Sequence, residues 1–232
     1  MTSLEPLEQA PALDAVVARM RALGAALPPE DGVAVFNGVY LRVTREVGEQ
    51  LAAGGFADAP AAAWLAVDFA ERYLAAVADA GRRPPACWRP LFQARRHGGI
   101  HPLQFALAGI NAHVGHDLPL SMVAACHRAG RDPEAMRGDF ERVGAVLERL
   151  EERIREELMP GPDLLDVADP LTHLLGAWSL EKGRDAAWAT SCALWPLREL
   201  PGVYGEFTRR LDQSVGLVGR CLLTPLRVPG QR

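Results

Sequence analysis

Residues 100–120 read IHPLQFALAGINAHVGHDLPL, an apolar helical run that polar, titratable side chains interrupt. On a helix that turns by roughly 100° per residue, positions i, i+3 and i+4 share a face. Four residues therefore fall within an arc of about 100°: Gly109, His113, His116 and Asp117. Glycine allows close approach of another group, and imidazoles and carboxylates bind metals or carry protons. The pattern predicts a functional site on this helix.

Both ends of the stretch carry helix-boundary signals. His101-Pro102 supplies an N-cap followed by proline at the first helical position. Asp117 precedes Leu118-Pro119, where it would serve as the N-cap of a following helix. We therefore expect a new helix over about residues 120–129, with Asp117 as either a site residue or a cap.

Helical periodicity continues on both sides of this stretch, and glycine and proline pairs such as Pro28-Pro29 and Gly54-Gly55 break it. Further helices are expected over about residues 11–27, 31–53, 58–81, 88–96, 132–159, 169–180, 184–195 and 201–223. Alternating strand patterns are nearly absent. We predict an all-α protein with a single multi-helix bundle domain of roughly eight to ten helices at residues 10–224. Residues 1–9 and 225–232 are expected to be flexible tails.

Composition narrows the class of protein. The net charge is −4 and the basic residues are scattered, which argues against nucleic-acid binding. No uncharged stretch reaches the length of a membrane span, and the acidic N-terminus does not resemble a secretory signal. The four cysteines are far apart in the sequence and are expected to be reduced. We expect a cytoplasmic protein, and the apolar helices near both ends leave room for a homodimer.

The helix expected over residues 58–81 contains AWLAVDFAERYL, where Trp64, Asp68, Glu71 and Arg72 lie along one side. A carboxylate in such surroundings is costly to bury unless it is paired. Asp68 and Arg72 are spaced i, i+4 and can satisfy each other. Alternatively, Asp68 faces and orients His113, or it forms half of a metal site with Glu71.

Aromatic residues gather in HLLGAWSLEKGRDAAWATSCALW, residues 173–195. Arg184 and Trp188 are spaced i, i+4, which permits a guanidinium to stack on an indole. Trp178 and its neighbours either line an apolar pocket for an organic ligand or simply pack in the core.

Several catalytic motifs are missing. The sequence has no GxSxG nucleophile elbow, no glycine-rich phosphate loop and no dinucleotide fingerprint. The spacing of the histidines does not match HExxH or ExxH, which weakens the case for a metal site.

The segments PLQFALAGINAHVGHDLPLSMV, VDFAERYLAA and AWSLEKGRDAAWATSCAL resemble a bacterial family of unknown function that is common in actinobacteria. Its signature, Gly-hydrophobic-Asn-Ala-His followed by Asp-Leu, falls on Gly109, Asn111, Ala112, His113, Asp117 and Leu118. The Asp and Tyr of its earlier helix fall on Asp68 and Tyr73, whereas Val114 and His116 depart from its pattern. The resemblance spans about residues 35–200. It implies an all-α fold and a candidate site but no reaction, and similar members often resemble parts of natural-product pathways.

Together these patterns predict a small-molecule enzyme of bacterial specialised metabolism that works without a cofactor. His113 would be the general acid and base, oriented by Asp117 or Asp68, for a non-redox cyclisation, elimination or hydrolysis of an apolar substrate. The expected substrate-binding residues are Trp64, Tyr73, Asn111, Trp178 and Arg184.

Two alternatives stay open. In the first, a divalent metal serves a hydrolase or oxygenase; its candidate ligands are His113, His116, Asp117, Asp68 and Glu71. In the second, the protein is a non-catalytic helical binding or scaffolding protein, and the polar cluster only fixes helix register.

Overall fold

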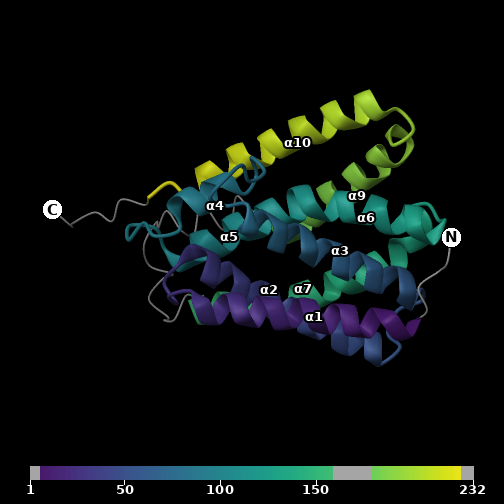
Figure 1. Cartoon of the computed structure of the whole chain (residues 1–232), viewed down its shortest axis with the longest axis horizontal. Helices are drawn as coiled ribbons and strands as arrows, with labels where there is room; N and C mark the ends of the chain where they lie inside the picture. Colours follow the sequence, from purple (N-terminus) through teal and green to yellow (C-terminus); the bar gives the residue numbers. More distant parts are fainter. Residues whose placement is uncertain (1–5, 159–178, 226–232) are drawn as a thin grey trace.

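The computed structural model describes residues 6–158 and 179–225, and it confirms an all-α bundle in a single domain (Figure 1). The helices are α1 Pro6–Ala26, α2 Gly32–Ala52, α3 Ala59–Ala78, α4 Arg89–Ala94, α5 Pro102–Ala112, α6 Leu118–Ala129, α7 Arg137–Leu158, α9 Leu180–Leu197 and α10 Pro201–Leu222. A π-helical turn, η1 His113–Asp117, joins α5 to α6, and a 3₁₀ turn, η2 Glu134–Met136, precedes α7. The described ranges contain no strand.

Boundaries differ from the sequence-based expectation in several places, and α9 begins at Leu180, four residues before the expected start. Helix α1 begins at Pro6, before residue 10, where the helical domain was expected to start. The helix expected over residues 132–159 is divided into η2 and α7. His101 caps α5 as expected, because its side chain accepts from the Leu103 amide and Gln104 completes a capping box. Most of the helix expected over residues 169–180 lies outside the described residues.

The central element is the helix made of α5, η1 and α6. Its first half packs against α2 on one side and α10 on the other, and its second half packs against α3 and α9 (Figure 1). All but one residue of α5 is buried from Leu103 to Ala112, so this apolar helix forms the middle of the bundle. Residues of the site therefore sit where four other helices converge.

Glycines set the close crossing of α5 with α2. A Cβ added at Gly109 would lie 2.8 Å from the Cβ of Phe36 and closer still to its ring, and one added at Gly32 would lie 2.5 Å from the ring of Phe105. Each helix thus supplies a glycine that receives an aromatic side chain of the other. The close approach that a glycine allows at position 109 is therefore used for a tight helix crossing.

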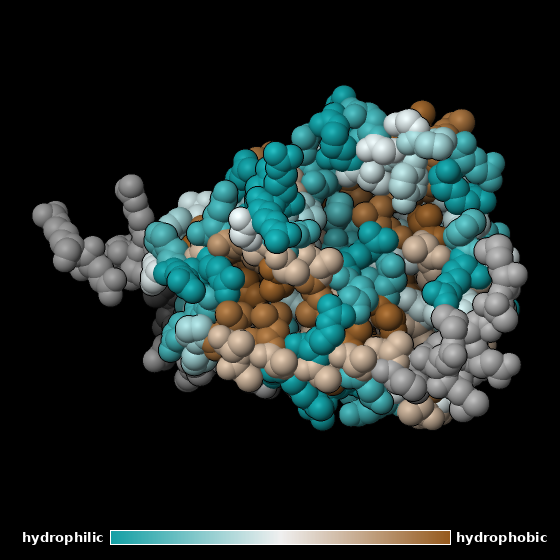
Figure 2. All heavy atoms as spheres, in the orientation of Figure 1, coloured by the Kyte–Doolittle hydropathy of each residue, from teal (hydrophilic) through white to brown (hydrophobic). Residues whose placement is uncertain are grey.

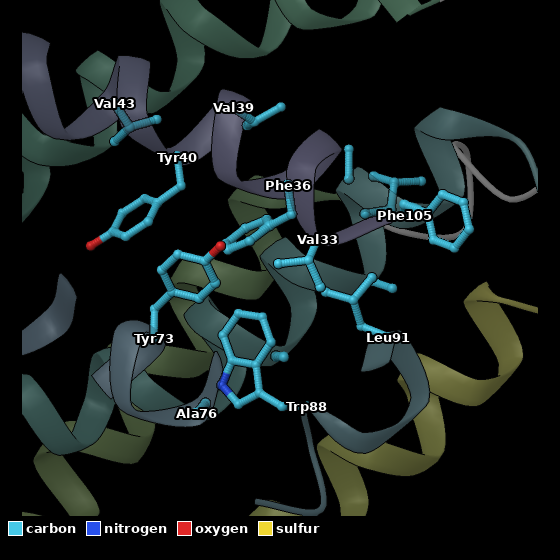
Figure 3. Packing of buried hydrophobic residues seen from close by; sticks show 14 of the residues in the cluster. Val33, Phe36, Val39, Tyr40, Val43, Tyr73, Ala76, Trp88, Leu91 and Phe105 are labelled. Atoms are coloured by element: carbon cyan, nitrogen blue, oxygen red, sulfur yellow. The ribbon is translucent and has the colours of Figure 1, made fainter. Parts of the chain in front are cut away.

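An aromatic cluster fills the core beside this crossing. Phe36, Tyr40, Tyr73 and Trp88 come from α2, α3 and the turn before α4, and Figure 3 shows their rings turned toward one another. The ring centroid of Phe36 lies 5.1 Å from that of Tyr73 and 5.3 Å from that of Trp88, and both contacts are edge-to-face. Trp88 and Tyr73 are completely buried.

The face of the molecule drawn in Figure 2 is mixed, with hydrophobic residues visible among hydrophilic ones. The most exposed large apolar side chains belong to α10 and the turn before it: Leu200, Val203, Phe207, Leu217 and Val218. A homodimer through this region stays a prediction. None of the described helices combines the length and the apolar character that a membrane span requires.

Gly109→Ala tests the helix crossing. The added methyl group would overlap Phe36, which is 1% exposed and has no room to move away. We expect a loss of about 1–3 kcal/mol in the free energy of unfolding, measured by urea denaturation, despite the better helix propensity of alanine. The matched control is Gly38→Ala in α2, where nothing lies within 4 Å of an added Cβ; it should be neutral or stabilising by up to about 1 kcal/mol. Equal effects of the two substitutions would contradict the crossing.

Candidate functional site

The central helix does not break at Asp117, which corrects the expected helix cap. Asp117 has α-helical backbone angles and its side chain makes no capping hydrogen bond. Instead the chain passes through the π turn η1, in which the amide of Leu118 donates to the carbonyl of His113. Pro119 lacks an amide hydrogen, and its ring would clash with the carbonyl of Gly115 in a regular α-helix. The wider turn accommodates the proline, and single π turns of this kind often occur at functional sites.

The π turn places the Asp117 carboxylate at the centre of a buried polar cluster. Its Oδ2 atom lies 3.1 Å from Nδ1 of His113 and accepts from Nε1 of Trp88 at 3.0 Å. Its Oδ1 atom lies 2.8 Å from Nδ1 of His116. All four residues are buried. Asp117 is therefore the group that orients His113, and His116 belongs to the same cluster.

The charge states of the cluster follow from these contacts. Burial alone would raise the pKa of the Asp117 carboxyl, but the hydrogen bonds from His113 and His116 outweigh it and hold the pKa below its ordinary value. Asp117 is thus ionised and only accepts, so Nδ1 of each histidine carries the hydrogen. Burial lowers the pKa of His113, against the opposing hydrogen bond to Asp117. His113 is accordingly neutral near pH 7, with a bare lone pair on Nε2.

Nε2 of His113 is buried and has no hydrogen-bond partner. Aromatic rings hold the imidazole in place: Phe69 is stacked on it with ring centroids 3.5 Å apart, and Tyr40 meets it edge-on at 4.2 Å. Leaving a buried acceptor unpaired costs about 1–3 kcal/mol. The arrangement is that of a fixed, neutral base in a medium of low polarity.

His113 forms part of the wall of a cavity of about 100 Å³. The wall comes mainly from α2, α3, α5 and η1, with Val143 and Leu147 of α7 and Leu180 of α9. Among the described residues that line it, the only polar side chains apart from His113 are those of Tyr40 and Thr44. Burial raises the pKa of the Tyr40 phenol well above its ordinary value, so this hydroxyl keeps its proton. The cavity therefore suits an apolar molecule or group that meets one base.

Asp68 and Glu71 pair with arginines and not with His113. For Asp68 this is the ion pair with Arg72, one of the alternatives that the sequence left open. The Asp68 carboxylate accepts from Nε of Arg72 at 2.7 Å and is 39% exposed. Glu71 pairs with Arg19 at the surface of α1 and α3. The carboxylate bonded to His113 is thus Asp117 and not Asp68.

All four of the expected substrate-binding residues that the structure describes lie outside the cavity wall: Trp64, Tyr73, Asn111 and Arg184. Trp64 packs beneath Arg128, whose guanidinium carbon lies 4.7 Å from the ring centroid. The Tyr73 hydroxyl donates to Asn37 at 3.3 Å, and Asn111 donates to the carbonyl of Val215 at 3.0 Å. Tyr73 is thus a member of the aromatic cluster in the core, and Asn111 links α5 to α10.

The aromatic set of residues 173–195 is only partly described. Trp178 lies outside the described residues. The guanidinium of Arg137 lies 5.4 Å from the ring centroid of Trp188, while Arg184 packs against Gly144 of α7. Neither arginine contributes to the cavity wall.

The metal-ligand set proposed from the sequence does not come together. Asp68 and Glu71 pair with arginines, and Asp117 is occupied by three donors. Within the described ranges, His116 is the one member of that set in a group with metal-ligand spacing, and its neighbours there are Cys87 and Asp212. The sequence interpretation assigned neither Cys87 nor Asp212 to a site.

The fold and the cluster define an all-α protein with a histidine–aspartate pair buried in its central helix. The chain belongs to the family of unknown function DUF5995, whose model matches residues 13–225. No curated protein and no solved structure gave a significant match to the chain.

The lowered pKa of His113 predicts a specific acid sensitivity. A histidine in an unfolded chain titrates near pH 6.5, whereas the pKa of His113 in the folded protein is lower. Just below pH 6.5 the unfolded chain therefore binds a proton at this position that the folded protein does not bind. The contribution of neutral His113 to the free energy of unfolding is complete above pH 6.5. It is lost as the pH falls toward the pKa of His113 in the folded protein, by up to about 1.4 kcal/mol per pH unit. Urea unfolding between pH 7.5 and 5 measures this slope.

His113→Gln should flatten the slope, because the glutamine amide can donate to Asp117 but does not titrate. His127→Gln, which replaces an exposed histidine of α6, is the matched control. A slope that does not change in His113→Gln would show that His113 is not held neutral.

Proposed function

We propose that the protein is a small-molecule enzyme in which His113 moves a proton to and from an apolar substrate held in the cavity. The observation that carries the proposal is the buried, unpartnered Nε2 of His113, a residue that lines the cavity. A ligand in the cavity that donates a hydrogen bond to Nε2 would remove the free-energy cost of leaving this acceptor unpaired.

His113, Asp117 and Tyr40 have separate roles in proton transfer. Nε2 removes a proton from the substrate, and the imidazolium that forms is stabilised by the Asp117 carboxylate 3.1 Å from Nδ1. The proton then returns from Nε2 to the departing or rearranged atom. The neutral Tyr40 hydroxyl, in the same wall, is the group that can donate a hydrogen bond to developing negative charge. Rings around His113 keep the base in one orientation.

Cavity size and composition constrain the substrate. An engineered apolar cavity of about 150 Å³ accepts benzene, and the cavity at His113, of about 100 Å³, is of that order. The reacting part of the substrate is therefore small and apolar. Elimination or cyclisation by removal of one proton fits this wall, as does hydrolysis if a water molecule enters beside the substrate. The setting in bacterial specialised metabolism, and the cytoplasm as its location, stay predictions.

The second candidate function is a non-catalytic binding protein. The same Nε2 could accept a hydrogen bond from an N–H or O–H group of a bound molecule without taking its proton. Binding and turnover of one probe separate the two functions.

1,2-Benzisoxazole is such a probe, because it is a small apolar molecule that opens when a base removes its ring C–H proton. The electron pair of that C–H bond forms a nitrile, the N–O bond breaks, and the oxygen leaves as a phenolate. We expect binding by NMR and turnover above the buffer rate by absorbance. The rate should be constant above pH 6.5 and fall in acid as His113 becomes protonated.

Three variants sharpen the test. His113→Gln should bind benzisoxazole but lose roughly 10²-fold or more of the rate, the usual contribution of a general base. Ala66→Leu, which fills the cavity from α3, should weaken binding. His127→Gln, on the surface of α6, should change neither. Binding without turnover would favour the binding protein, and turnover that survives His113→Gln would refute the role of His113.

A further inference from the structure

The far side of the His116 ring faces a second cluster that the proton-transfer proposal does not use. Nε2 of His116, Sγ of Cys87 and a carboxylate oxygen of Asp212 all lie within 4.8 Å of one another. They come from three separate segments, because Cys87 lies in the turn before α4, His116 in η1 and Asp212 in α10.

We propose that Cys87, His116 and Asp212 bind a divalent transition-metal ion of the zinc class. Thiolate, imidazole and carboxylate are the three ligand types that zinc takes in proteins, and three protein ligands leave a fourth position open. A thiolate in the set favours zinc or a similar borderline-soft ion over magnesium or calcium. The proposal goes beyond the proton-transfer function and does not depend on it.

Orienting contacts around the cluster match those of metal sites. Metal-binding histidines usually donate their second ring N–H to a carboxylate, and Nδ1 of His116 lies 2.8 Å from Oδ1 of Asp117. Since Nδ1 carries the hydrogen, the Nε2 lone pair is directed to the side of Cys87 and Asp212. The Asp212 carboxylate is fixed by the amides of Ala86 and Cys87 at 2.9 and 2.8 Å. These two bonds leave lone pairs on both oxygens for a metal.

Charge also favours a cation at this place. Burial raises the pKa of the Cys87 thiol, and the negative charges of Asp117 and Asp212 raise it further. Two carboxylates beside a buried thiol create a negative potential, and a bound divalent ion reverses it and deprotonates the thiol. The Asp212 side chain is 22% exposed, which gives an ion access from the surface.

The cluster needs only a small contraction to bind an ion. Nε2 of His116 and Oδ1 of Asp212 are 4.0 Å apart. Two ligands of a tetrahedral zinc ion, each about 2.1 Å from the metal, are about 3.4 Å apart. Helix α10 already lies close to the turn that carries Cys87, because a Cβ added at Gly216 would lie 2.5 Å from the carbonyl oxygen of Ala86.

Cobalt(II) is the probe for the test, because it replaces zinc and absorbs light. The full chain is treated with a chelator, freed of it and titrated with Co²⁺ at neutral pH under reducing conditions. We expect one Co²⁺ per chain, a thiolate-to-cobalt charge-transfer band, and loss of that band on adding one equivalent of Zn²⁺. Absence of stoichiometric binding, or binding with no thiolate band, would overturn the proposal without any variant being made.

Substitutions locate the ligands. Cys87→Ser should abolish the thiolate band and weaken Co²⁺ binding by more than the roughly 10–100-fold that loss of a supporting residue costs. Cys126→Ser removes another buried cysteine and should keep the band. A band that persists in Cys87→Ser would assign the metal to a different thiol and refute the site.

His113→Gln keeps the two proposals distinguishable. It leaves Cys87, His116 and Asp212 in place and should bind one Co²⁺ with the band intact, even though it loses benzisoxazole turnover. If Co²⁺ does not bind while His113-dependent turnover is observed, the metal site fails alone.

Discussion

The ionised carboxylate of Asp117, buried in the middle of the bundle, is the group that the rest of the structure must satisfy. A buried charge without partners would be very costly, and removal of one partner from such a group usually costs several kcal/mol. Hydrogen bonds from His113, His116 and Trp88 stabilise the charge of Asp117. These bonds join the central helix to the turn before α4, and they fix which nitrogen of each histidine keeps its hydrogen.

The backbone reflects the same constraint. Pro119 would clash one turn back in a regular helix, and the π turn that relieves the clash also turns His113 and Asp117 toward the core. Gly109, one turn before His113, lets Phe36 pass close to α5, so that the aromatic cluster surrounds the imidazole. The local sequence that shapes the helix thus also produces the environment in which His113 is neutral.

Helical periodicity, the glycine at the crossing and the i, i+4 spacing of His113 and Asp117 are local patterns, and the sequence alone was enough to predict them. Partners distant in the chain were not predictable. Trp88 lies 29 residues before Asp117, and nothing near it indicates that its indole would donate to that carboxylate. For Asp68, the sequence allowed both the nearby Arg72 and the distant His113, and the pair on one helix formed. The π turn escaped prediction because Asp117 before Leu118-Pro119 is also a sound N-cap signal.

Asp117 contacts both proposed sites, and this makes them one electrostatic unit. Its Oδ2 accepts from His113 and its Oδ1 accepts from His116. A positive charge on one imidazole therefore changes the strength of the hydrogen bond between the carboxylate and the other imidazole. A divalent ion on Nε2 of His116 would make Nδ1–H a stronger donor and draw Asp117 toward His116. Positive charge nearby would also disfavour protonation of His113 and lower its pKa further. The ion would therefore make His113 a weaker base that stays deprotonated to lower pH, although it never touches the cavity.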